Sequence, residues 1–228
     1  MLRICDVSVS LGNLSVLDRV SFHVNEREIV VLIGPSGCGK STILRAISGL
    51  VPMESGQINR NEGRLAFVFQ DNRLLPWRTV YDNVRLVNEE EAPGEIDELL
   101  AAVGLRGFEG YYPSQLSGGM LKRCGIARAF FRHGQLLLMD EPFQGLDYPL
   151  RREMLSMLLQ VWRSRPQGVV FVTHEIDEAL SVASRILVMS KRPTRVIREF
   201  LLPGSEGRDP TREDLSSIRR EIIEVITK

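Results

Sequence analysis

A phosphate-binding loop is the feature that most constrains what this chain can fold into. The stretch GPSGCGKS, from Gly34 to Ser41, fits the pattern G-x-x-x-x-G-K-[ST] and follows the apolar run Ile29–Ile33. Its glycines let backbone N–H groups turn inward around an anion, and the helical pattern that follows adds the positive end of a helix. The sequence therefore predicts a nucleotide phosphate site between a buried strand and a helix.

Individual residues of this loop have predicted roles. Lys40 can reach the β- and γ-phosphates of a nucleotide, and the Ser41 hydroxyl can hold Mg²⁺. Cys38 has no catalytic need to lie in the loop, and we interpret it as a tolerated small residue. The predicted nucleotide-binding residues of the loop are Gly34, Pro35, Ser36, Gly37, Cys38, Gly39, Lys40, Ser41 and Thr42.

A second apolar run, at 136–139, ends in the adjacent carboxylates Asp140 and Glu141. In a parallel sheet, ligands bind at the carboxyl ends of the strands, where these acids would fall. We expect Asp140 to hold Mg²⁺ through water and Glu141 to polarise the attacking water as general base. Acids commonly terminate strands, so the catalytic interpretation depends on the phosphate-binding loop upstream.

Short apolar runs alternate with helical patterns along much of the chain, as in a parallel sheet covered by helices. The runs lie at 29–33, 136–139, 169–172 and 186–189, and the helical patterns at 41–50, 151–163 and 176–184. Residues 4–9 and 20–24 alternate polar and apolar side chains, which predicts a small β region at the start. The fold class is therefore α/β.

Two further segments complete the predicted organisation. Residues 71–132 are rich in helix and loop patterns and are interpreted as an inserted helical subdomain. The acidic stretch at 88–98 is taken as a solvated loop and helix start in preference to a partner site. Segment 204–228 is expected to form a C-terminal amphipathic helix that packs on its own domain, and 1–70 with 133–203 to form the β region and core.

Composition limits the partners and the compartment. The 29 Lys and Arg residues balance the 29 Asp and Glu residues, so no strong field favours nucleic acid, and we expect none as a partner. The apolar runs are far shorter than the roughly 18 residues of a membrane helix. Three cysteines cannot pair completely, and the N-terminus lacks a secretory pattern, which favours a reducing compartment.

The remaining motifs resemble the ABC ATPase family over almost the whole chain. LSGGM at 116–120 is similar to the family signature, with Met where Gln is more usual. Gln70, Asp147 and His174 match the glutamine of the Q-loop, the aspartate of the D-loop and the switch histidine, in family order. The resemblance implies a P-loop NTPase (RecA-like) core with an N-terminal antiparallel β region and an inserted α-helical subdomain.

The resemblance also implies roles for these residues. Ser117, Gly118 and Gly119 would close over the γ-phosphate bound by the opposite subunit; an ordinary helix cap would explain Ser117 but not the paired glycines. His174 would sense the γ-phosphate, although a strand-end histidine satisfied by its neighbours is the plain alternative. Gln70 would be a Mg²⁺ ligand that links the site to the inserted subdomain.

One position departs from the family pattern. The family usually places an aromatic residue near the end of the first strand to stack on adenine, and this chain has Leu11 there. Leu11 offers apolar contact without π stacking, so discrimination between ATP and GTP stays open.

The segment DNRLLPWRTVYDNV at 71–84 resembles the nitrate, sulfonate and taurine importer subgroup, as do EPFQGLD and KRPTRV. This implies an ATPase that energises uptake through a separate membrane permease. At least one of Leu74, Leu75 and Trp77 is expected to contact the permease, while others pack within the subdomain. Further expected partners are a second ATPase subunit in a head-to-tail dimer and, indirectly, a periplasmic or extracellular solute-binding protein. A soluble ABC-type ATPase and a small P-loop kinase are the alternatives, and the cargo stays open.

Overall fold

The computed structural model describes residues 1–61, 63–88, 93–202 and 207–227. The strands are β1 (Leu2–Leu11), β2 (Leu14–Val24), β3 (Ile29–Ile33), β4 (Ser55–Arg60), β5 (Leu65–Val68), β6 (Leu136–Asp140), β7 (Gly168–Thr173), β8 (Arg185–Met189) and β9 (Val196–Leu201). The helices are α1 (Lys40–Ile47), α2 (Val80–Arg85), α3 (Pro93–Ala102), α4 (Gly118–Phe131), α5 (Tyr148–Ser164), α6 (Ile176–Val182) and α7 (Ser216–Thr227), with short 3-10 turns η1 (Pro113–Gln115) and η2 (Glu213–Leu215).

A six-stranded sheet with the order β5-β6-β7-β3-β8-β9 forms the centre of the described chain. Strands β5 to β8 in this sheet run parallel, and β9 runs antiparallel to β8 at one edge. Every residue of β3, β6, β7 and β8 is buried, as expected for strands covered on both faces. The α/β prediction is confirmed.

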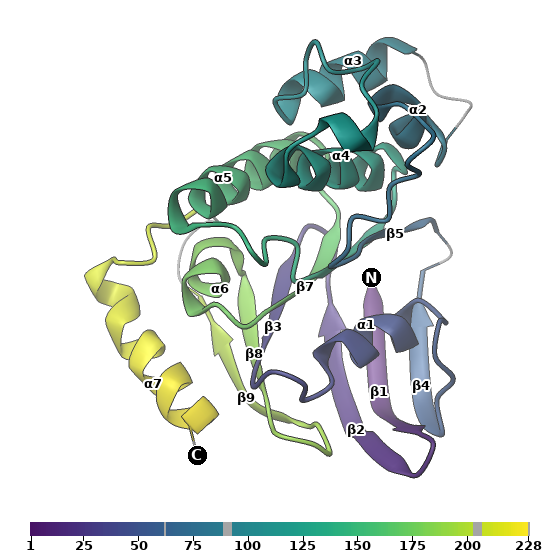
Figure 1. Ribbon diagram of the computed structural model, residues 1–228. Helices are drawn as coiled ribbons and strands as arrows, with labels where there is room; N and C mark the ends of the chain where they lie inside the picture. Colours follow the sequence, from purple (N-terminus) through teal and green to yellow (C-terminus); the bar gives the residue numbers. More distant parts are fainter. Residues whose placement is uncertain (62, 89–92, 203–206, 228) are drawn as a thin grey trace.

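A smaller antiparallel sheet, of order β2-β1-β4, lies beside the first (Figure 1). The period-two alternation predicted near the start of the chain corresponds to β1 and β2, whose apolar residues are buried except for Leu11 and Leu14 at the turn between them. Strands β4, β5 and β9 were not predicted. β4 is almost entirely exposed and lacks apolar alternation, so its pairing with β1, not its own pattern, defines it.

Apolar side chains cover the two faces of the large sheet differently. Val30 and Leu32 of β3 join a cluster with α1 and the small sheet, whereas Val31 and Ile33 join the core that contains α4, α5 and α6. Helix α1 is therefore enclosed between the two sheets, which fixes the loop that precedes it.

Helices α2, α3 and α4 gather at one end of the molecule, where α4 packs beside α5 (Figure 1). All three lie within 71–132, although the boundaries of that subdomain stay a prediction. Residues 89–92 of the acidic stretch lie outside the described residues, and α3 begins directly after them. The predicted C-terminal helix corresponds to α7, which buries Ile222; 203–206 and 228 lie outside the described part of the chain. No helix in that part is long and apolar enough to cross a bilayer.

Candidate nucleotide site

The strand order brings the predicted motifs to one edge of the sheet. β6, β7 and β3 are neighbours, and their carboxyl ends lead into the acids, into His174 and into the phosphate-binding loop respectively. Residues 34, 140 and 174 are far apart in sequence and become neighbours because parallel strands end at the same edge.

The phosphate-binding loop is a tight backbone cradle. Gly37 and Gly39 have φ values of +71° and +129°, which residues with a Cβ rarely adopt. A Cβ on Gly39 would lie 2.9 Å from Val16 Cγ1, so glycine is required at this position. Lys40 is buried, and its ammonium donates to the carbonyls of Gly34 at 2.8 Å and Pro35 at 3.0 Å. The cation is thereby held within the loop.

Ser41 and Asp140 are in direct contact. The Ser41 hydroxyl donates to Asp140 Oδ1 at 2.7 Å, which joins the first turn of α1 to the end of β6. Burial raises the pKa of Asp140, an effect that the Ser41 hydrogen bond opposes and the neighbouring Glu141 carboxylate reinforces. A hydroxyl and a carboxylate side by side form an oxygen donor pair that suits Mg²⁺, which is also bound by nucleotide phosphates and water.

Glu141 and His174 form a second pair at the same edge. Glu141 Oε2 lies 3.0 Å from His174 Nδ1, and the Glu141 backbone N–H donates to the Val172 carbonyl at 3.0 Å. The φ angle of Glu141 is +43°, a left-handed conformation that is uncommon for non-glycine residues. The turn after β6 thus directs this carboxylate toward the end of β7.

Gln70 follows β5, next to β6 in the sheet. Its side-chain amide donates to the carbonyl oxygen of Gln144, which belongs to the EPFQGLD segment. Both side chains are exposed. The contact connects the segment that leads into α2 with the segment that follows the two acids.

The signature and D-loop residues lie on other elements. Ser117 caps α4 by accepting a hydrogen bond from Met120 N at 3.3 Å, and Asp147 caps α5 by accepting one from Leu150 N at 2.9 Å. α4 packs mainly on α2, α3, α5 and β5, whereas α1 packs on β2, β6 and β7. The described contacts do not join Ser117, Gly118 or Gly119 to the phosphate-binding loop of the same chain.

Residues 190–195 form a part of this edge that the sequence analysis did not assign to the site. The Thr194 hydroxyl donates to the Cys38 carbonyl, and its backbone pairs with β2 at Val16 and Asp18. Arg192 Nη2 lies 3.5 Å from where a Cβ of Gly37 would be. From the sequence, KRPTRV indicated only a resemblance to the importer subgroup. Its position beside the loop follows from the pairing of β8 with β3, which could not be read locally.

Glu178 of α6 was also missed. It is 3% exposed, accepts a hydrogen bond from the Thr173 hydroxyl at 2.6 Å and lies 3.5 Å from Arg151 Nε. Burial raises its pKa to about 7, although the Thr173 hydrogen bond and the Arg151 charge oppose the shift. This carboxyl lies in the wall of a small cavity that also includes Glu141 and His174.

Known proteins resemble this chain over most of its length. The ABC transporter family model matches residues 17–144. A taurine import ATP-binding protein of Rhizobium johnstonii is 46% identical over 198 residues, covering 81% of this chain and 75% of the relative. An aliphatic sulfonates import ATP-binding protein of Pseudomonas aeruginosa is 38% identical over 239 residues, covering 98% and 95%.

Solved structures agree with this likeness. A dimeric ATP-binding cassette in a post-hydrolysis state, bound to ADP and Pi, superposes with a TM-score of 0.78 at 29% identity, covering 90% of this chain and all of that chain. The ATP-binding subunit of an ABC transporter superposes over both complete chains with a TM-score of 0.81 at 24% identity, which concerns the fold alone.

The raised pKa of Glu178 predicts a pH-dependent stability. Below pH 4.5 the carboxyl is protonated in the folded and unfolded states; between 4.5 and about 7 only the folded state keeps the proton. This contribution to stability is therefore lost as pH rises through 7, by about 3 kcal/mol at full ionisation. Glu178→Gln cannot ionise, so its stability relative to wild type should rise from pH 5 to pH 8.

Urea unfolding at pH 5, 6.5 and 8 measures this difference. Glu224→Gln, at an exposed position of α7, is the control and should follow the wild-type pH profile. Parallel profiles for wild type and Glu178→Gln would show that the carboxyl titrates equally in both states.

Proposed function

Because the chain belongs to the ABC transporter family, we propose that it is the ATP-binding and ATP-hydrolysing subunit of an importer for taurine-like or other sulfonate-type anions. The proposal rests on the edge of the sheet where β3, β6 and β7 end. There the Ser41–Asp140 and Glu141–His174 contacts lie beside the glycine-rich phosphate-binding loop. This edge combines a phosphate site, a metal-compatible oxygen pair and a carboxylate base.

In this proposal the phosphate-binding loop holds the β- and γ-phosphates through its backbone N–H groups and Lys40. Ser41 and Asp140, with Gln70, would hold Mg²⁺, and the ion would supply positive charge against the phosphates. The donor set fits, because hydroxyl, carboxylate and amide oxygens are the ligands that Mg²⁺ accepts.

Glu141 is the proposed general base. It is the carboxylate closest to His174, and its backbone is fixed by the Val172 carbonyl, so its side chain starts from a defined position. Accepting the proton of the attacking water requires the ionised form. His174 would orient this carboxylate and meet the γ-phosphate at its exposed face.

A second copy of the chain is the proposed partner at the nucleotide. Ser117 and the paired glycines are exposed or half-buried at the start of α4, and the hydrogen bond described for the Ser117 side chain is to Met120 N in its own helix. A head-to-tail dimer would bring them to the loop of the opposite subunit, and Asp147 to the interface. The similarity to a dimeric cassette bound to ADP and Pi supports this arrangement.

A membrane permease is the proposed partner of segment 71–79. Arg128 donates to the carbonyls of Asn72 and Arg73, and the buried Asn83 side chain bonds to Leu75. The segment is thus anchored by hydrogen bonds, yet the Trp77 side chain is 69% exposed. A rigidly presented, exposed tryptophan is a favourable interface anchor.

A groove beside this segment offers more contact surface. Its volume is about 310 Å³, and Phe67 and Phe69 stack at 4.0 Å with the Arg73 guanidinium 4.0 Å above Phe69. Leu74, in contrast, packs partly on the core. We propose that the groove and Trp77 receive the permease, and that Gln70, directly before segment 71–79, transmits nucleotide state to it.

The proposed location is the cytoplasmic face of the membrane, and the relatives' names as taurine and sulfonate import ATP-binding proteins support it. We further propose that a solute-binding protein delivers the cargo from outside. The alternative, a soluble ABC-type ATPase not coupled to transport, would leave the anchored and exposed Trp77 without a role.

Glu141→Gln tests the enzymatic part of the proposal. The amide keeps the shape of the side chain but cannot accept the proton, so Mg-ATP binding should survive while turnover falls by roughly 10² to 10⁴. Equilibrium binding, steady-state phosphate release and light scattering with ATP measure this, and scattering should show a shift toward a dimer. Glu175→Gln, at a neighbouring acid, is the control; equal turnover in both variants would remove Glu141 as base.

Arg192→Gln tests the role of residues 190–195, which the sequence did not assign to the site. In the described chain this guanidinium has no ion pair or hydrogen bond, and it lies beside the apex of the phosphate-binding loop. Its loss should weaken Mg-ATP binding by about fivefold at low salt and less at high salt. Arg220→Gln on α7 removes the same charge elsewhere; an equal loss of affinity there would show that only net charge matters.

Trp77→Ala tests the permease contact. Because the side chain is exposed, its removal should change unfolding free energy by less than about 0.5 kcal/mol and leave basal ATPase intact. Co-purification with the permease and transport by the assembled complex should fall. Trp162→Ala, at a buried tryptophan, should instead cost roughly 3 to 5 kcal/mol. A Trp77 variant that melts early yet still binds the permease would place this side chain in the core.

A further inference from the structure

Residues 190–195, between β8 and β9, form a turn that is closed by its own hydrogen bonds. The Ser190 N–H donates to the Arg195 carbonyl at 2.9 Å, and the Ser190 hydroxyl accepts a hydrogen bond from the Arg195 N–H at 2.9 Å. The Arg195 guanidinium also donates from Nε to the Asp18 carboxylate of β2 at 2.8 Å. The turn therefore keeps one shape and is attached to the small antiparallel sheet.

Thr194 is the residue of this turn that contacts the phosphate-binding loop. Its N–H donates to the Val16 carbonyl at 2.8 Å, and its carbonyl accepts from the Asp18 N–H at 3.0 Å. The residue is fully buried, and its hydroxyl donates to the Cys38 carbonyl. Because β2 holds the backbone of Thr194 from both sides, the small sheet sets the position from which this hydroxyl reaches the loop.

The contact fixes the orientation of the peptide between Cys38 and Gly39. This peptide is trans, so its C=O and N–H groups lie in one plane and point in opposite directions. The carbonyl points to Thr194, and the Gly39 N–H therefore points away from it. Among the described residues, no acceptor is hydrogen-bonded to this N–H. It is a free backbone donor at the predicted phosphate site.

Gly39 benefits from such a restraint because of its own backbone. Its φ of +129° is accessible to glycine and rare for other residues. The same freedom lets the neighbouring peptide rotate, and a ligand that fixes it loses affinity to the entropy of ordering. Thr194 Oγ1 lies 3.0 Å from where a Cβ of Gly39 would be, so the hydroxyl lies close beside the glycine that it restrains.

We propose that Thr194 is a positioning residue for the nucleotide: by holding the Cys38 carbonyl, it directs the Gly39 N–H at a bound phosphate. The inference rests on the proposed function, because it needs a nucleotide in the loop. The backbone of such a loop surrounds the β-phosphate, which is not transferred. A donor to that phosphate acts equally in the bound ground state and in the transition state, so its effect lies in KM more than in kcat.

Thr194→Val and Thr194→Ser test the proposal, since valine keeps the shape without the hydroxyl and serine keeps the hydroxyl. Calorimetric titration of the full chain with Mg-ADP should give an affinity about tenfold weaker for Thr194→Val, and within about twofold of wild type for Thr194→Ser. In steady-state hydrolysis, Thr194→Val should raise the KM for Mg-ATP about tenfold and lower kcat by less than about twofold.

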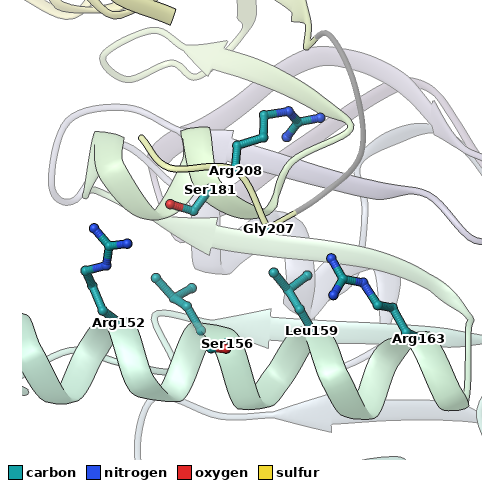
Figure 2. A pocket seen from close by; sticks show the side chains of 8 residues that line it. Arg152, Ser156, Leu159, Arg163, Ser181, Gly207 and Arg208 are labelled. Atoms are coloured by element: carbon teal, nitrogen blue, oxygen red, sulfur yellow. The ribbon is translucent and has the colours of Figure 1, made fainter. Parts of the chain in front are cut away.

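Ser181→Ala is the matched control. This buried hydroxyl also donates to a backbone carbonyl, that of Asp177 at 2.7 Å, but it lies in the wall of a separate cavity between α5 and α6 (Figure 2). Its removal takes away a bond of the same kind, so it should lower the melting temperature and leave the affinity for Mg-ADP unchanged. Melting temperatures of all variants show whether a loss of affinity comes from a loss of folded structure.

Two results would overturn the positioning role. One is a Thr194→Val variant that binds Mg-ADP as tightly as wild type. The other is a Thr194→Ser variant that loses as much affinity as Thr194→Val, which would assign the effect to packing of the methyl group. If Thr194→Val does not fold, Thr194→Cys replaces it, because a thiol is only a weak donor and should bind Mg-ADP less tightly than the serine variant. Failure of the wild-type chain to bind Mg-ADP would instead contradict the proposed function, which separates the two.

Discussion

The hydrogen bond between Ser41 and Asp140 is the contact on which the nucleotide edge depends. It joins the helix after the phosphate-binding loop to the strand that carries both acids, across 99 residues of sequence. The bond exists because β7 lies between β3 and β6 in a parallel sheet, which brings their ends together. A different strand order would separate the loop from its acids while leaving every motif intact.

The same edge contains two locally unfavourable features, a buried acid and a left-handed backbone conformation. Asp140 is buried beside another carboxylate, and Glu141 has a left-handed backbone; both are unfavourable in isolation. The buried strands β3, β6 and β7 hold these residues in place through their ladders of backbone hydrogen bonds. Stability from the sheet thus offsets the cost of placing two neighbouring acids and a left-handed residue at this edge.

Much of the nucleotide edge could be predicted from the sequence, because each of its motifs is a continuous stretch of the chain. The runs at 29–33 and 136–139 match β3 and β6, since strands buried on both faces are apolar throughout. β4 and β9 were missed because mostly exposed strands lack that signal, and their partners define them. Arg192 and Trp77 could not be placed from the sequence for a similar reason. The position of Arg192 beside the phosphate-binding loop and the solvent exposure of Trp77 both depend on tertiary structure.

The hydrogen bond that caps α4 also affects how readily a second subunit could bind at Ser117. Ser117 Oγ accepts a hydrogen bond from Met120 N, so its rotamer is already fixed while its own proton stays available to donate. An incoming anion would meet a donor that is oriented beforehand, and little rotational entropy would be lost on contact. The same serine that starts the helix would therefore present an oriented donor to the proposed second subunit.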